Sequence, residues 1–217
     1  MAPEVPDLRD GCGWQTASQK IEIIRELISS HGPRVDMLEV GTWTGHGAIH
    51  WRAEIAKLPE KGTLTCVDPW RPYHSEQDIA RSWMCREMNK LLEADEAYRL
   101  FLRNIGFGKH DVPIYHHRAT LKEVSHLLPK FDVILIDGSH YYEDVATDIR
   151  LARTLLKSGG LLVGDDLEKT YDEVDEATVR AHPKTDFIDG FHPGVTAAVW
   201  DSFGHVPRRS SVWYVLC

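Results

Sequence analysis

Three carboxylates and one histidine follow two apolar stretches of the chain. Asp137 comes directly after the run 131–136, and Asp165 and Asp166 come after the run 161–163. His140 stands three residues beyond Asp137. Carboxylate oxygens are the ligands that Mg²⁺ prefers, and a histidine with its ordinary pKa of ~6.5 can take a proton near neutral pH. These residue types therefore predict a magnesium site with a general base beside it.

The elements around these residues determine whether the carboxylates can meet. The run 131–136 (FDVILI) is typical of a central strand buried on both faces. A helix with apolar residues at 145, 149, 152 and 156 then leads to a strand at 161–163. A right-handed crossover makes two such strands parallel. If they are also neighbours, their tips lie ~4.8 Å apart, so the carboxylates could share one cation with oxygen ligands at ~2.1 Å.

Each of these interpretations has a plainer alternative. Asp165 or Asp166 could cap a turn or a helix, which is the common role of aspartate at such a place. His140 could be a solvated loop histidine. Without a cation, three adjacent carboxylates would repel one another, and one would tend to take up a proton. Because acidic residues end both strands, we predict that Asp137, Asp165 and Asp166 bind the metal and that His140 is the base.

A glycine-rich turn follows an earlier apolar run, 35–40, which contains Glu39. Gly41, Gly45 and Gly47 come next, and then residues 48–58 with the spacing of an amphipathic helix. Strand, glycine turn and helix form the nucleotide pocket of open α/β sheets. The spacing is not the G-x-G-x-x-G of dinucleotide enzymes, and a carboxylate at the strand end suits a cationic ligand. The alternative is an ordinary turn between a strand and a helix.

A second strand is predicted at 62–67 and ends at Asp68, where Rossmann-like folds bind the hydroxyls of a ribose. The alternative is a solvated loop aspartate. A third strand is predicted at 112–116, a helix at 121–128, a last helix at 194–203 and a final edge strand at 211–217. Before the glycine turn, residues 1–33 are predicted to form a loose arm followed by a helix at 16–30.

Two segments fall outside this alternation. Residues 74–106 form an insertion that is helical by pattern, and they are either a wall or lid of the site or a plain pair of packing helices. Residues 167–193 are acidic and polar with little periodicity, so we expect a mobile loop at the mouth of the site.

The composition limits the partners and the location. The net charge is −8, from 25 Lys and Arg against 33 Asp and Glu, which argues against a sequence-independent grip on nucleic acid. No secretory signal and no run of ~20 apolar residues is visible, so we expect no membrane partner and a cytoplasmic protein. The four cysteines show no C-x-x-C and suit reduced thiols. The 217 residues suit one domain.

The motifs Asp137-Gly-Ser-His140 and Gly164-Asp-Asp166 resemble class I methyltransferases that use S-adenosylmethionine (SAM), and within them the small enzymes related to macrocin O-methyltransferase. The resemblance implies an α/β, Rossmann-like, doubly wound and mostly parallel sheet of about seven strands with helices on both faces. It implies Mg²⁺ on Asp137, Asp165 and Asp166, and His140 as base. It also implies a SAM site made of Glu39, Gly41, Thr42, Trp43, Gly45, Gly47, Asp68 at the ribose, Ala119 or Thr120 near adenine, and Asp137.

The predicted function is Mg²⁺-assisted transfer of a methyl group from SAM to a hydroxyl of a small molecule. The Asn/Asp-Pro-Pro-aromatic run of many enzymes that methylate nitrogen is absent, which favours oxygen. Three alternatives stay open: a metal-independent SAM methyltransferase, a SAM-binding protein without turnover, and an NAD-dependent oxidoreductase. The sequence leaves the acceptor unnamed and does not decide between a monomer and a homo-oligomer.

Overall fold

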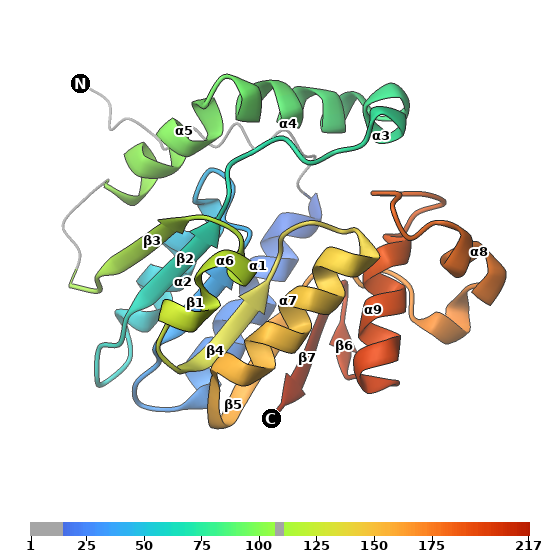
Figure 1. Ribbon diagram of the computed structural model, residues 1–217. Helices are drawn as coiled ribbons and strands as arrows, with labels where there is room; N and C mark the ends of the chain where they lie inside the picture. Colours follow the sequence, from blue (N-terminus) through green and yellow to red (C-terminus); the bar gives the residue numbers. More distant parts are fainter. Residues whose placement is uncertain (1–14, 107–110) are drawn as a thin grey trace.

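One mixed sheet forms the centre of the computed structural model, which describes residues 15–106 and 111–217 (Figure 1). Within these ranges the sheet has seven strands in the order β3-β2-β1-β4-β5-β7-β6. Strands β1 to β5 are parallel, and β7 pairs antiparallel with both β5 and β6. Their bounds are β1 Met37–Val40, β2 Leu64–Asp68, β3 Ile114–Arg118, β4 Phe131–Ile136, β5 Leu156–Gly164, β6 Arg208–Arg209 and β7 Val212–Leu216.

Helices cover both faces of the sheet. Helices α1 (Gln15–His31) and α2 (His46–Ile55) pack on one face, against side chains such as Met37 and Val133. Helices α6 (Leu121–Val124), α7 (Tyr142–Leu155) and α9 (Pro193–Phe203) cover the other face, against side chains such as Leu38 and Ile134. Neighbouring strand residues point to opposite faces, so one strand contributes to both cores. The predicted doubly wound α/β fold is confirmed.

The inserted segment is helical, as its pattern predicts. It contains α3 (Glu76–Arg81), α4 (Trp83–Glu93) and α5 (Glu96–Ile105), which lie across the top of Figure 1, beyond the carboxyl ends of the parallel strands. Phe101 of α5 is buried and packs against Trp70 with ring centroids 4.6 Å apart. The segment also joins the core on one face of the sheet, and Met84, Met88 and Leu92 of α4 line the cavity described below.

Three predictions about individual elements are corrected. The final strand is not at the edge, because β7 lies between β5 and the two-residue β6, which is too short to show a pattern. Strand β5 begins at Leu156 and not at 161, directly after α7 ends at Leu155. The helix expected at 121–128 is a single α-helical turn that continues as a 3₁₀ turn at Ser125–Leu127.

The segment 167–193 contains more structure than its polar sequence suggests. It includes a 3₁₀ turn at Tyr171–Glu173 and α8 (Glu176–Ala181), and it buries Asp186 and Phe191. A six-residue helix is too short for a periodic pattern to stand out. Among the helices of the described ranges, none has the length and apolar character needed to cross a bilayer.

Candidate active site

The glycine turn after β1 lies directly against the turn after β4. Gly41 has φ +84°, and a Cβ there would come 2.1 Å from the carbonyl oxygen of Asp137 and 2.4 Å from Gly138 Cα. Only glycine fits such an approach at a positive φ. The close contact places Asp137 beside the glycine turn, so the predicted nucleotide pocket and the predicted metal site share one crevice.

Asp68 at the end of β2 fixes the shape of this turn. Its Oδ2 accepts hydrogen bonds from the backbone nitrogens of Thr42 (3.0 Å) and Trp43 (2.9 Å), and its Oδ1 accepts one from Trp70 N (2.6 Å). Trp43 is held at a positive φ of 51°. Burial raises the pKa of Asp68 against these donors. A carboxylate offers about four acceptor positions, so about one remains for a ribose hydroxyl.

The carboxyl group of Glu39 is buried and hydrogen-bonded within the protein. Its side chain is 2% exposed, and its Oε1 accepts a 2.6 Å hydrogen bond from Trp51 Nε1 of α2. A Cβ on Gly47 would lie 2.4 Å from the same oxygen, so that glycine makes room for Glu39. Burial raises the pKa of Glu39 to about 8, so this carboxyl ionises less readily than an exposed glutamate does. The expected attraction of a cationic ligand to its charge is correspondingly reduced.

The predicted carboxylates do meet. Strands β4 and β5 are parallel neighbours with Ile136 opposite Gly164, and oxygens of Asp137, Asp165 and Asp166 lie within 4.8 Å of one another. Their contacts are not those of helix caps: Asp165 Oδ1 accepts a 2.6 Å hydrogen bond from Ser211 Oγ, and Asp166 contacts His140. The prediction that two strand tips bring the three carboxylates together is confirmed.

A lysine from α1 already neutralises part of this cluster. Lys20 Nζ lies 2.7 Å from Asp137 Oδ2 and 2.5 Å from Asp165 Oδ2. Burial alone would lower the pKa of Lys20, but the carboxylates raise it well above its usual value. Burial and the neighbouring acids raise the pKa of Asp137 to about 7, although Lys20 opposes them. The cluster is a strong attractor of positive charge.

His140 lies between two carboxylates rather than on an open surface. Its Nε2 is 3.0 Å from Asp166 Oδ2, and its Nδ1 is 2.8 Å from Asp186 Oδ1. Burial would lower the pKa of His140, but the two carboxylates raise it well above the usual value. The pKa of Asp166 is in turn lowered, chiefly by His140 acting against burial. In this arrangement Asp186 fixes the ring, and Nε2 faces the acidic cluster.

Three residues of the site were not predicted from the sequence: Lys20, Asp186 and His192. The ring of His192 lies 4.2 Å from that of His140, and its Nδ1 is 3.0 Å from Glu168 Oε1. Lys20 belongs to the lead-in helix, and the other two belong to the segment 167–193. The sequence offers only one signal for these three residues, which is their type: one is a cation and two are possible metal ligands.

A cavity of about 1200 Å³ connects these groups. Such a volume is at the upper end of pockets for one ligand, ~300–1,000 Å³, so it has room for a donor and an acceptor together. The predicted residues that line it are Glu39, Gly41, Thr42, Trp43, Gly47, Asp68, Ala119, Asp137, His140, Asp165 and Asp166. Gly45 is not in this lining; a Cβ there would touch Phe101 of α5.

Comparison with known families identifies the chain. The model of the methyltransferase domain matches residues 38–167, more than half of the sequence. The chain belongs to the methyltransferase-domain family. This confirms the predicted class of enzyme, a SAM-dependent methyltransferase. No curated protein matches this methyltransferase.

Solved structures share the fold of this methyltransferase at low sequence identity. The O-methyltransferase NovP superposes with a TM-score of 0.57 and 17% identity over 91% of this chain and 79% of its own. An O-methyltransferase from Bacillus cereus, solved with S-adenosylhomocysteine (SAH), gives 0.51 and 13% over 92% and 81%. Cofactor-bound Rv0187 from MTB gives 0.51 and 13% over 98% and 83%.

Proposed function

We propose that this methyltransferase transfers the methyl group of SAM to a hydroxyl of a small molecule, with His140 as the base. The observation that carries the proposal is the shared crevice, in which the glycine turn, Asp68 and His140 line one cavity. Two of the solved structures above, NovP and the protein from Bacillus cereus, are O-methyltransferases with the same fold, which supports the choice of reaction.

Different residues of the crevice would bind the methyl donor and take the proton. Asp68 and the turn at 41–43 would hold the adenosyl part of the donor, and Trp43 Nε1, buried without a hydrogen-bond partner, offers a further donor to a polar ligand. His140 Nε2 faces the acidic cluster and would take the proton of a hydroxyl bound there. The acceptor oxygen then gains the methyl group, and SAH is left. Much of the acceleration comes from positioning, because the donor is already activated.

The acidic cluster fits a hard divalent cation in its donor atoms. Asp137, Asp165 and Asp166 would hold Mg²⁺, and their attraction for positive charge is visible in the position of Lys20. When bound, the ion would supply a Lewis acid for the acceptor hydroxyl and would offset the carboxylates that raise the pKa of His140. The position of Lys20 also favours a second candidate, a metal-independent methyltransferase in which the ammonium stays as the permanent counter-charge.

The assay that tests the reaction uses SAM with a labelled methyl group and a panel of phenols, catechols and glycosides. We expect labelled O-methyl product and SAH from at least one class. Treatment with EDTA should abolish turnover, and added Mg²⁺ should restore it. Full activity after EDTA would establish the metal-independent candidate, whereas label on nitrogen or no product across the panel would contradict O-methylation.

The variant Lys20→Met tests whether the ammonium and Mg²⁺ compete for the same carboxylates. Removing one partner from a buried ion pair costs about 3–5 kcal/mol, and we expect less here because Lys20 is 24% exposed. The Tm of Lys20→Met should fall in metal-free buffer, and Mg²⁺ should raise it more than it raises the wild-type Tm. Lys90→Met, which removes an exposed lysine of α4, is the matched control. An equal response to Mg²⁺ in all three proteins would place the metal elsewhere.

A further inference from the structure

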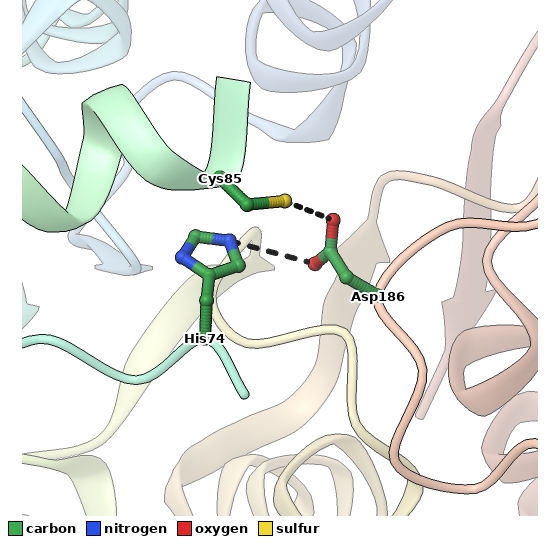
Figure 2. Close-up of side chains that lie close together, drawn as sticks. All are labelled: His74, Cys85 and Asp186. Atoms are coloured by element: carbon green, nitrogen blue, oxygen red, sulfur yellow. Dashed lines mark hydrogen bonds and ion pairs between the residues drawn. The ribbon is translucent and has the colours of Figure 1, made fainter. Parts of the chain in front are cut away.

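A second group of possible metal ligands lies between the inserted helices and the segment 167–193. His74 precedes α3, Cys85 lies in the first turn of α4, and Asp186 comes from the far segment (Figure 2). Cys85 Sγ is 3.5 Å from Asp186 Oδ2, and His74 Nε2 is 3.8 Å from Asp186 Oδ1. One sulfur, one nitrogen and the two oxygens of one carboxylate thus converge from three separate parts of the chain.

The distances and the burial suit a metal ion. In a tetrahedral zinc site with bonds of ~2.0–2.3 Å, a nitrogen and an oxygen ligand lie about 3.4 Å apart, and a sulfur and an oxygen about 3.6 Å apart. The sulfur lies 3.5 Å from Oδ2 and the nitrogen 3.8 Å from Oδ1 of the same carboxylate, and one ligand atom from each residue lies within 4.8 Å of the other two. His74, Cys85 and Asp186 are 7%, 2% and 4% exposed. Buried groups of this kind are costly unless they are paired or hold a metal.

Neighbouring polar groups orient the ligands. His74 Nδ1 lies 3.0 Å from Asn89 Oδ1, an acceptor that favours the tautomer with its proton on Nδ1 and a free lone pair on Nε2, toward Asp186. Asp78 Oδ1 accepts a 3.1 Å hydrogen bond from the backbone nitrogen of Asp186, and Asp78 Oδ2 accepts one from Tyr141 Oη (2.6 Å). Metal ligands are commonly held by such outer partners.

We propose that His74, Cys85 and Asp186 form a zinc site, separate from the acidic cluster at Asp137. The mixture of thiolate, imidazole and carboxylate suits Zn²⁺ and not Mg²⁺, which prefers oxygen alone. Cys85 now donates its thiol proton toward Asp186; on binding, that proton is released and the thiolate becomes the ligand. Three protein ligands leave the fourth tetrahedral position to water. The proposal does not depend on the methyl-transfer reaction.

The site would join α4 to the segment that carries Asp186. Asp186 is also the residue that fixes the His140 ring through Oδ1, while Oδ2 faces Cys85. A zinc ion held by this carboxylate would therefore lock the far segment over the active-site cavity, which His74 and Asp186 both line. Metal binding to the folded state alone should raise the stability of the whole chain.

The test uses the full-length protein, freed of metal and titrated with Zn²⁺ and then with Co²⁺. We expect one tight equivalent of zinc, a rise in Tm, and a cobalt spectrum with a thiolate charge-transfer band and the strong visible bands of a tetrahedral site. The cobalt spectrum is read on the wild type, so it does not depend on a variant that folds. Absence of a tight equivalent, or cobalt bound without a thiolate band, would overturn the proposal; the latter would place the metal at His140, Asp166 and His192 or at the acidic cluster.

Variants then assign the thiolate. Cys85→Ser should remove the charge-transfer band and weaken zinc binding by more than the ~10–100-fold that loss of an outer partner costs. Asn89→Ala should weaken binding within that ~10–100-fold range and keep the band. Cys217→Ser, which changes an exposed thiol, is the matched control and should bind as the wild type does. A band that persists in Cys85→Ser would contradict the assignment.

Discussion

Replacing His140 with asparagine should lower kcat by about 10²–10⁴-fold, the usual contribution of a general base. His140 Nε2 faces the acidic cluster and accepts the proton in the proposed reaction, whereas asparagine keeps a polar group there but cannot take a proton. The measurement is the rate of SAH formation with the best acceptor of the panel. The affinity for SAM, measured by calorimetry, should stay close to that of the wild type, because Asp68 and the glycine turn are unchanged.

The control for this result is His126→Asn, which changes an exposed histidine on the 3₁₀ turn after α6. It should leave kcat unchanged. If His140→Asn keeps a kcat near that of the wild type, the base lies elsewhere. If it loses SAM binding as well, His140 supports the pocket and is not a catalytic residue.

Replacing Gly41 with alanine should lower the free energy of unfolding by about 2–5 kcal/mol and abolish most SAM binding. Alanine at positive φ costs about 1–2 kcal/mol, and overpacking typically adds about 1–3 kcal/mol. The overlap here is with backbone, since the new Cβ would lie 2.1 Å from the Asp137 carbonyl oxygen. The two turns must therefore separate, which disturbs the donor pocket and the acidic cluster together. Urea unfolding measures the stability.

Gly159→Ala isolates the effect of the overlap. Gly159 has a similar φ of +74°, but a Cβ there meets nothing within 4 Å. Only the cost of the positive φ should appear, about 1–2 kcal/mol, with SAM binding unchanged. If the two variants lose equal amounts of stability and SAM binding, the overlap between the two turns adds nothing to the cost of the positive φ.

The fold could be predicted because its apolar runs are continuous and its strand ends are polar. The run 131–136 predicts β4 with the bounds that the structure has, and the tips of β4 and β5 bring Asp137, Asp165 and Asp166 together as their order in the sequence implies. Hydrophobic period and the handedness of crossovers determine both results.

The rest of the site depends on contacts between distant segments. Lys20 meets Asp137 across 117 positions, and Asp186 meets His140 across 46. A helical pattern shows which face of α1 is buried, but not which polar residue reaches the strand tips. The raised pKa of Glu39 likewise follows from burial of its side chain, which the residue type alone does not reveal.

The structure of a complex with SAH and Mg²⁺ tests the central claim most directly, that one crevice at the strand tips holds both the methyl donor and the base. The account predicts SAH in the cavity, with a ribose hydroxyl on Asp68, its sulfur on the side of His140, and the metal on Asp137, Asp165 and Asp166. SAH bound away from the glycine turn, or with its sulfur on the side of the cavity remote from His140, would contradict it.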